Sequence, residues 1–456
     1  MLIQIYQIKL GTTLFPPTVG QDHHWSIFIN SPLGQLYKTI PFQALAAKLP
    51  KRQHSCGRKP RFSPEGGIAL QVLKHYYKVS DDKLIELLNG SYQLQYFCGI
   101  RLRIGEKISD GDVVSRWRML IGEHLSWEQW QSVLVQAWKA DLEQTQTNLA
   151  DATCVESYIR YPTDVKLLWE SVLFLRSELH SLCRSLKFPF LRTKYRDIKK
   201  ATQVYLKRKR KTHQQTRRIK KRLLNLLVKL LEFAPVIIGL WKQQAAHHLD
   251  MPPLKQGFMK KLSTIKKVCH QQQILFERPT QTMPDRIVSL AKPYVHPIVR
   301  GKENKRVEFG MKLHLMQIDG VNFIEHASWQ AFHEGVRLKK TIWRHRLYFR
   351  TCLHFGGDRI YANNANRKYC SNQQIFTSFV PKGRKAKDEK EKKQLRRLIA
   401  KERATRLEGS FGTAKNHYLL DKVKARNQKT ELTWIFFGFL TANAQQIKKK
   451  REPPPL

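Results

Sequence analysis

Apolar residues recur every three or four positions between residues 63 and 138, and this spacing predicts a group of short helices. Ser63 followed by Pro64 marks one helix start, because serine caps helix N-termini and proline is tolerated in the first turn. Ser80 followed by Asp81 marks a second start in the same way. Short helices joined by polar turns are typical of helix-turn-helix DNA-binding modules and equally of helical dimerisation domains, and the spacing does not separate the two.

Two-residue alternation takes over in other parts of the chain. Residues 148–156 and much of 285–330 alternate apolar and polar side chains, which predicts strands. Asp319 followed by Gly320 lies between two alternating runs and predicts a hairpin turn. Further elements are predicted as long helices over 162–245, a helix over 331–348, a strand over 349–357, a short helix over 364–376, a helix over 398–420 and a buried helix over 432–440. The chain is therefore expected to combine a mixed sheet with a large helical insertion.

The charge balance indicates what kind of partner the chain binds. The 456 residues include 82 Lys and Arg against 36 Asp and Glu, which gives a formal charge of +46. Such an excess indicates polyanion binding, with nucleic acid as the commonest polyanion and an anionic membrane surface as the competitor. A hydrophobic content of 41% and an aromatic content of 10% indicate a folded chain rather than a basic tail.

The densest basic stretch is residues 207–222, within the predicted helical insertion. A run of charges is most often just a solvated helix face. This run, however, contains no acid. Because this run has one sign and suits a helix, phosphate contact is the preferred interpretation. The residues expected to make that contact are Arg217, Arg218, Lys220 and Lys221.

The cysteines and the apolar runs argue against several other classes. Seven cysteines are scattered without a C-x-x-C pair, which supports neither a zinc site nor a disulfide framework. The first residues lack the charged start and the long apolar core of a signal peptide. The longest apolar run, residues 223–241, contains Lys229, Glu232 and Pro235 and does not predict a membrane span. A cytosolic protein with reduced thiols is expected.

Three acids stand at positions where a carboxylate needs an explanation. Asp151 interrupts the predicted strand 148–156, Asp358 follows a predicted strand and two glycines, and Glu408 lies on the predicted helix 398–420. A carboxylate in a core strand needs a partner or a metal, although an Asp at a strand edge or bend is the simpler interpretation. The order of strand acid, strand-end acid and helix acid suits a ribonuclease-H-like α/β core that holds two divalent metals.

The helix over residues 398–420 carries a second pattern. Positions seven apart return to nearly the same helix face, so Lys401, Glu408 and Lys415 form one stripe. The residues expected to face a core are Leu398, Leu407 and Phe411. A glycine inside a helix costs roughly 1 kcal/mol relative to alanine, so Gly412 on the same stripe hints that another molecule approaches closely. One acid on a positive, glycine-flanked face suits a metal ligand beside a phosphate backbone. An ordinary solvated helix with an ion-paired Glu is the alternative.

Several stretches together resemble the DDE transposases of bacterial insertion sequences. They are FSPEGGIALQVLKHYYKVSDDKLIELL, LQYFCGI, LADATCVE, PIVRGKENKRVEFGMKLHL, GGDRIYANNANRKYC and RLEGSFGTAKNHYLL, which span roughly residues 60–445. The combination is much more specific than any single stretch. The domains expected with this resemblance are an N-terminal extension (1–60), an all-α DNA-binding or dimerisation domain (61–140), a ribonuclease-H-like catalytic core with a mixed sheet (141–161 and 286–445), a helical basic insertion (162–285) and a disordered basic tail (446–456).

By this resemblance Asp151, Asp358 and Glu408 form the catalytic triad and hold two Mg²⁺ ions, for which Mn²⁺ can substitute. Two ions about 3.5–4 Å apart can activate water, stabilise charge on phosphorus and hold the leaving oxygen in line. The implied activity is cleavage of a DNA strand at the end of the element, followed by attack of the freed 3′-hydroxyl on target DNA. No covalent protein nucleophile is required.

The resemblance also assigns DNA contacts. Lys415 matches the lysine that follows the family's glutamate after six residues. The family signature has Arg and Tyr where this chain has Ala404 and Lys401. Arg403 and Arg406 are the candidates to substitute for that arginine, although neither shares the face of the glutamate on an α-helix. Further DNA contacts are expected from Lys401, Arg300, Lys302 and Arg359.

The implied partners are double-stranded DNA, as terminal inverted repeats and as target, and a second copy of the chain, because two element ends must be held together. No membrane partner is expected, and the expected location is the bacterial cytoplasm in association with the nucleoid. Two alternatives stay open. One is a catalytically inactive or domesticated transposase-derived DNA-binding protein, and the other is a structural, RNA-associated basic protein.

Overall fold

The computed structural model describes residues 19–50, 60–247, 254–299, 307–382 and 389–452. The chain forms two compact units, and each is described by itself. The first unit comprises residues 1–158 and 311–456, and it contains all three acids of the predicted triad. The second unit comprises residues 159–310, and it contains the basic run at 207–222.

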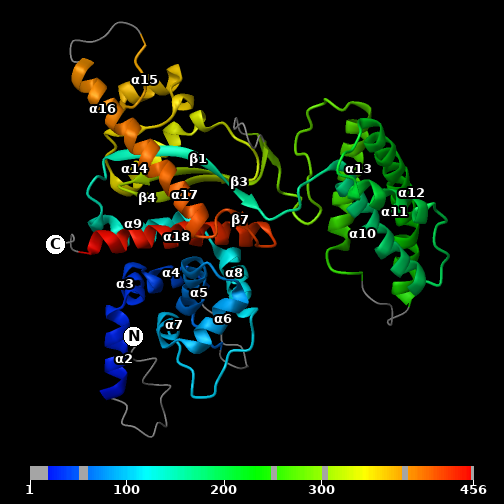
Figure 1. Cartoon of the computed structure of the whole chain (residues 1–456), viewed down its shortest axis with the longest axis horizontal. Coiled ribbons are helices and arrows are strands. Elements are labelled where there is room, and N and C mark those ends of the chain that lie inside the picture. Colours follow the sequence, from blue (N-terminus) through cyan, green and yellow to red (C-terminus); the bar gives the residue numbers. More distant parts are fainter. Residues whose placement is uncertain (1–18, 51–59, 248–253, 300–306, 383–388, 453–456) are drawn as a thin grey trace. The chain divides into compact units, whose positions relative to one another are not determined.

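Short helices make up the N-terminal part of the first unit. They are α2 (Val19–Asn30), α3 (Pro32–Thr39), α4 (Phe42–Ala46), α5 (Pro64–Tyr77), α6 (Asp81–Gly90), α7 (Tyr92–Phe97), α8 (Val113–His124), α9 (Trp127–Trp138) and the 3-10 helix η1 (Lys139–Asp141). The hydroxyls of Ser63 and Ser80 accept hydrogen bonds from the N–H groups of Gly66 and Lys83, so both predicted helix starts are confirmed. Residues of these helices share one hydrophobic core with α18 (Gln428–Arg451) and with part of the sheet. In Figure 1, α18 lies between the N-terminal helices and the sheet.

A mixed sheet is confirmed in the described residues. Its strands are β1 (Thr147–Ser157), β2 (Pro297–Val299), β3 (Val307–Ile318), β4 (Val321–Ser328), β5 (His354–Gly356), β6 (Phe376–Thr377) and β7 (Lys422–Val423). β1 lies between β3 and β5, β3 and β4 form an antiparallel hairpin, and β5 pairs parallel with both β1 and β6. The hairpin turns at Asp319 and Gly320, whose φ angles of 46° and 85° suit a type I′ turn, as the sequence predicts.

The register between β1 and β5 decides which side chains are neighbours. Thr147 pairs with His354, and Leu149 pairs with Gly356, so partner residues differ by 207 positions (354 − 147). Asp151 and Asp358 differ by the same 207 positions, and each lies two residues beyond the last pair. Because neighbouring strands lie about 4.8 Å apart, this register brings the two predicted acids side by side.

Helices cover both faces of the sheet next to these acids. On one face, α14 (Leu338–Phe349) packs its Ile342 into a cluster with Ala150 and Phe355. On the other face, Ile399 packs in a cluster with Leu149. Because successive side chains of a strand alternate between faces, Asp151 points to the same face as Leu149, toward the helix that carries Glu408. Figure 1 shows α16 and α17 crossing the sheet on this path.

The helix predicted over residues 398–420 contains a change of register. It is built from α16 (Glu389–Glu402), the π-helix η4 (Arg403–Leu407) and α17 (Glu408–His417). A π-turn holds one residue more than an α-turn, so the faces before and after it do not line up. Ile399 faces the core at 5% exposure, whereas Leu398, which the sequence pattern placed there, is 59% exposed. Lys401 therefore does not share a face with Glu408, and that part of the predicted stripe is wrong.

One segment expected to lack structure is helical in part. Residues 446–451, predicted as part of a disordered tail, continue α18. Lys450 pairs with Asp319 at 2.7 Å and Arg451 pairs with Asp141 at 2.8 Å. These ion pairs connect the basic end of α18 to the rest of the first unit, which explains the difference from the composition-based prediction.

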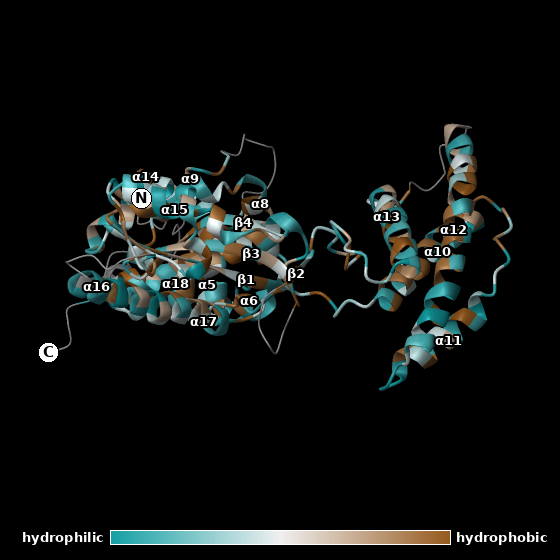
Figure 2. Cartoon of the chain, turned by 90° about the horizontal axis from the view of Figure 1, so that it is seen from above, coloured by the Kyte–Doolittle hydropathy of each residue, from teal (hydrophilic) through white to brown (hydrophobic). Residues whose placement is uncertain are grey.

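The second unit is a helical bundle with its own core. Its helices are α10 (Asp164–Ser185), α11 (Tyr195–Lys207), α12 (His213–His247) and α13 (Phe258–Glu277). The short helix α15 (Asn364–Asn372) belongs to the first unit. Apolar and hydrophilic residues alternate around the bundle helices in Figure 2. α12 is long and apolar enough to cross a membrane by length and composition. Its Leu223, Leu227 and Leu230 are completely buried in the bundle, which is the behaviour of a core helix.

Candidate metal centre

Three carboxylates from separate parts of the first unit meet at the end of β5. Asp151, Glu334 and Asp358 each offer one oxygen, and these oxygens lie within 4.8 Å of one another. Asp151 comes from β1, Asp358 follows β5, and Glu334 begins the 3-10 helix η2 (Glu334–Val336). All three residues are partly buried. Ligands of sheets with parallel strands bind at the carboxyl ends of those strands, so this is a suitable place for a site.

Asp358 is held by the turn that follows β5. Its Oδ1 accepts a hydrogen bond from the N–H of Ile360 at 3.0 Å, so the side chain caps the 3-10 helix η3 (Arg359–Tyr361). Gly356 allows α16 to approach the strand, because a Cβ at that position would lie 2.7 Å from Ile399. Close packing therefore explains why residue 356, two positions before the predicted acid Asp358, is a glycine.

Glu334 is fixed by two attachments. Its carboxylate pairs with Lys312 Nζ at 2.8 Å, and the two side chains are only 12% and 15% exposed. Asn366 Nδ2 donates hydrogen bonds to the carbonyls of Gly335 at 2.7 Å and Tyr361 at 2.9 Å. These bonds tie the turn that carries Glu334 to the turn that follows β5. The closeness of the two acidic turns is therefore built into the fold.

The protein supplies a cation of its own beside this cluster. Arg403 Nη1 lies 2.7 Å from Asp151 Oδ2 and 3.0 Å from Glu408 Oε1. Arg403 and Asp151 are 19% and 15% exposed, whereas the Glu408 side chain is 52% exposed. Glu408 is thus linked to the cluster through Arg403. Within the described residues, it is not among the carboxylates whose oxygens lie within 4.8 Å of one another.

The π-turn explains how Arg403 reaches Glu408. Residues five apart on an α-helix point in different directions. In η4 the N–H of Glu408 donates to the carbonyl of Arg403, an i to i+5 bond that stacks the two residues one turn apart. The expectation that neither candidate arginine shares the face of the glutamate is therefore wrong for Arg403. Arg406 pairs instead with Glu402 at 2.7 Å.

A buried polar chain lies behind the cluster. Tyr361 Oη lies 2.6 Å from His314 Nε2, and His314 Nδ1 lies 3.0 Å from Glu325. Arg337 donates to both oxygens of Glu325, at 2.6 and 3.0 Å. Burial acts to raise the pKa of Glu325, but the bonds from His314 and Arg337 outweigh it and lower that pKa to about 2. Because Arg337 follows η2 and Tyr361 belongs to the helix capped by Asp358, this chain anchors both acidic turns.

The two aspartates of the cluster resist ionisation. Burial raises the pKa of Asp151 to about 6, and the charges of Asp358 and Glu334 add to that effect against the opposing Ala152 N–H and Arg403. The pKa of Asp358 is also raised, first by burial and then by the charge of Glu334. A bound cation would relieve this repulsion, which is the behaviour expected of metal ligands before the metal arrives.

Ionised Asp151 is expected to destabilise the metal-free fold. Its folded pKa of about 6 exceeds the ordinary value of 3.8, so the folded state binds the extra proton and stability falls as pH rises through that window. Asp151→Asn removes this cost, and the variant should be more stable at pH 7 by up to about 3 kcal/mol, with the difference vanishing only below about pH 3. Urea unfolding of both proteins in the presence of a chelator measures the effect. A variant less stable than the wild type at pH 7 would contradict it.

The predicted DNA-contact residues of the first unit lie in different places. Arg359 directly follows Asp358 and is exposed, and Lys401 is exposed near the end of α16. Lys415 lies in the last turn of α17 and is partly exposed. Arg300 and Lys302 lie outside the described residues.

The residues of the basic run in the second unit differ in how far they are exposed to solvent. Arg218 and Lys221 are exposed on α12, and Arg217 lies over the ring of Phe276, 4.7 Å from its centroid. Lys220 pairs with Asp164 at 2.9 Å and is only 12% exposed. Lys220 is therefore paired within the bundle, and the phosphate contact predicted for it stays a prediction.

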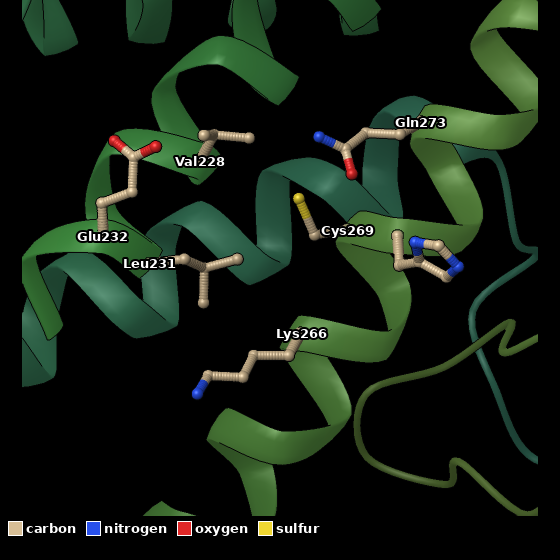
Figure 3. A pocket seen from close by; sticks show the side chains of 7 residues that line it. Val228, Leu231, Glu232, Lys266, Cys269 and Gln273 are labelled. Carbon is tan, nitrogen blue, oxygen red and sulfur yellow. The ribbon is translucent and has the colours of Figure 1, made fainter. Parts of the chain in front are cut away.

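A pocket of about 320 Å³ lies between α12 and α13 in the second unit (Figure 3). Its lining residues are Val228, Leu231, Glu232, Lys266, Cys269, His270 and Gln273. Glu232 is the single carboxylate among these lining residues. The pocket therefore lacks the convergent acids that the first unit offers, and it is not the candidate metal centre.

Glu334 is the member of the cluster that the sequence did not reveal. The pattern placed it inside a helix over residues 331–348, whereas it begins a short 3-10 helix ahead of α14. The usable signal was the glycine that follows it. A Cβ at Gly335 would lie 2.5 Å from the carbonyl oxygen of Ile360, so this turn requires a residue without a side chain.

The donor set fits a hard divalent cation. Carboxylate oxygens are the ligands that Mg²⁺ prefers, and two ligands of one octahedral ion lie about 3–4 Å apart. The oxygens of Asp151, Glu334 and Asp358, all within 4.8 Å, need only small side-chain rotations to reach that spacing. With Glu408, four carboxylates stand against Arg403 and Lys312, so two negative charges remain for a divalent ion.

Two family models match the chain. One, described as Transposase DDE domain, matches residues 356–444, which include Asp358 and Glu408. The other, described as Transposase domain (DUF772), matches residues 23–120, the region of the N-terminal helices. No curated protein and no solved structure matches the chain. The resemblance to transposases of bacterial insertion sequences is confirmed by these two matches.

Proposed function

We propose that the chain is a DDE transposase that binds the ends of an insertion sequence, cleaves a DNA strand there and transfers the freed 3′ end to target DNA. The observation that carries this proposal is the register of Asp151 and Asp358 on neighbouring parallel strands, with Glu408 linked to Asp151 through Arg403. Convergence of like charges works against folding, because burial and mutual repulsion raise the pKa of both aspartates. Such an arrangement favours a functional explanation over a structural one.

A ribonuclease-H-like core is the finer fold that we propose for the sheet region. The position of β1 supports it, between an antiparallel hairpin (β3 and β4) and two parallel strands (β5 and β6). The proposed core covers residues 141–161 and 286–445, and the proposed insertion covers residues 162–285. Residues 61–140 would then form the helical domain that reads DNA or dimerises.

The cofactor that we propose is Mg²⁺, as two ions, with Mn²⁺ able to substitute. Asp151 and Asp358 would hold it together with Glu408, and Glu334 would add a fourth carboxylate beside them. When bound, such ions activate the attacking oxygen and neutralise charge on the transferred phosphate. Asp151 is mostly ionised at neutral pH, because its pKa of about 6 lies below that range, so it can hold a cation without first losing a proton.

Double-stranded DNA, as terminal inverted repeats and as target, is the proposed substrate. Arg359 and Lys401 on the first unit and Arg218 and Lys221 on the second are exposed cations that can contact phosphates. The excess of 82 Lys and Arg over 36 acids predicts binding that weakens steeply as salt is added. Two ends must be held at once, so a homodimer is the proposed working form, in the bacterial cytoplasm at the nucleoid.

A catalytically inactive, transposase-derived DNA-binding protein is the second candidate. Ala404 and Lys401 favour it, because they replace the arginine and the tyrosine of the family signature. Arg403 argues for activity, because the π-turn brings its guanidinium to Glu408 in spite of the shifted sequence position. The balance favours an active enzyme.

The test is strand cleavage on the DNA that flanks the coding region. Short inverted repeats in that DNA supply the substrate, and purified protein with Mg²⁺ or Mn²⁺ should nick at their outer ends and join a labelled 3′ end to a target plasmid. Binding of these ends without nicking in either metal would favour the inactive candidate. Preference for structured RNA over duplex ends would overturn the transposase proposal.

A further inference from the structure

We infer that Arg403 is a positioning residue that keeps the metal site closed by pairing with Asp151 and Glu408, and that DNA opens the site by taking over its guanidinium. The inference rests on the proposed function. It assigns a coupling between metal binding and DNA binding to one named side chain.

Arg403 uses the oxygens that a metal would need. Its Nη1 lies 2.7 Å from Asp151 Oδ2 and 3.0 Å from Glu408 Oε1. Asp151 Oδ2 cannot serve a cation and keep this ion pair at full strength, because both draw on the same lone pairs. Glu408 meanwhile stays 52% exposed and apart from the three clustered carboxylates. The arginine and the metal are therefore competitors for Asp151 and Glu408.

Each of the three clustered carboxylates has a support other than Arg403. Asp151 Oδ1 accepts a separate hydrogen bond from the N–H of Ala152 at 2.7 Å. Glu334 is held by Lys312, and Asp358 is held by the N–H of Ile360. When Arg403 leaves, the three clustered carboxylates keep their supports, so the site opens rather than collapses.

DNA offers Arg403 a better partner. A guanidinium forms paired, charge-assisted hydrogen bonds with phosphate oxygens, so a phosphate can replace the two carboxylates. The residue also sits at the start of a π-helix, a geometry that is rare and frequent at functional sites. Turning Arg403 toward a phosphate would free Glu408 to join Asp151 at the cation.

The same helix offers a matched control. Arg406 lies three residues away in the same π-segment and pairs with Glu402 at 2.7 Å, outside the cluster. It is 49% exposed, against 19% for Arg403. Replacing either arginine removes one positive charge from this segment. Only the Arg403 variant removes a competitor from the oxygens of Asp151.

The test measures Mn²⁺ binding to the full chain without DNA, with electron paramagnetic resonance as the readout. Arg403→Gln should bind Mn²⁺ roughly 10-fold more tightly than the wild type, since a charge-assisted hydrogen bond no longer has to be broken. Arg406→Gln should change the affinity by less than about twofold, as expected for an exposed pair. Circular dichroism and thermal unfolding confirm that each variant is folded, and Arg403→Lys, which keeps the charge, should fall between wild type and Arg403→Gln.

A second measurement repeats the titration with a blunt-ended duplex of arbitrary sequence, after subtraction of Mn²⁺ bound by the duplex alone. The duplex should raise the Mn²⁺ affinity of the wild type and should raise that of Arg403→Gln much less, because coupling between two ligands is reciprocal and runs through the arginine. Equal or weaker Mn²⁺ binding by Arg403→Gln would overturn the inference. If the wild type and Asp151→Asn bound the same amount of Mn²⁺, both with and without the duplex, Asp151 would not be a metal ligand. The proposed function itself would then fail.

Discussion

Asp151→Asn is expected to reduce metal-dependent strand cleavage by on the order of 10³-fold, the scale of losing one well-placed group that stabilises transition-state charge. The exchange removes a charged ligand and leaves the size of the side chain almost unchanged. Asp151 lies between Asp358, Glu334 and Arg403, so an amide there cannot offset the charge of a divalent ion in the same way. The measurement is the rate of nicking on end DNA in Mg²⁺ and in Mn²⁺.

Stability separates this effect from misfolding. The same variant should be more stable than the wild type at pH 7 in a chelator, because the raised pKa of about 6 makes ionised Asp151 costly to the fold. A residue whose loss raises stability and abolishes activity serves function at the expense of the fold. Duplex binding should be retained by Asp151→Asn. Wild-type cleavage rates in this variant would contradict its assignment as a metal ligand.

Glu408→Gln is expected to match the loss caused by Asp151→Asn, while Glu334→Gln should reduce cleavage by about 10–100-fold, the range typical of groups that support metal ligands. Glu408 is the third acid of the proposed triad and becomes available when Arg403 leaves. Glu334 lies within the cluster but is also neutralised by Lys312. Single-turnover nicking rates of both variants on the same end DNA measure the difference.

Glu402→Gln is the control for this comparison, because Glu402 lies on the same helix and pairs with Arg406 outside the cluster. It should retain nearly full activity. A Glu334→Gln variant as inactive as Asp151→Asn, together with an active Glu408→Gln, would move the third ligand from Glu408 to Glu334.

Much of the local structure follows from the sequence pattern. The serine caps and the Asp319–Gly320 turn each depend on residues close together in the chain, and each is found where the sequence predicts it. The sequence points to Asp151 and Asp358, because acids at such strand positions need an explanation and because the surrounding stretches resemble DDE transposases. Their common register could not be derived from the pattern, because pairing between strands far apart in sequence has no local signal.

The structural features that the sequence pattern does not predict share a physical cause. Glu334 lies in a short turn whose position depends on contacts of Asn366 with the turn after β5, and no periodicity reports such contacts. The π-turn at Arg403–Leu407 adds one residue to a helix whose sequence still has helical spacing, so the pattern placed Leu398 in the core. The pairing of Lys220 with the half-buried Asp164 does not follow from composition, because composition does not show which cation lies beside which acid.

Anomalous diffraction from crystals soaked in Mn²⁺ locates a bound ion without reference to activity. Manganese should be bound by oxygens of both Asp151 and Asp358, at distances of about 2.2 Å, with the guanidinium of Arg403 displaced from Asp151. Manganese absent from this place, with Arg403 still paired to Asp151 and Glu408 under saturating Mn²⁺, would contradict this prediction.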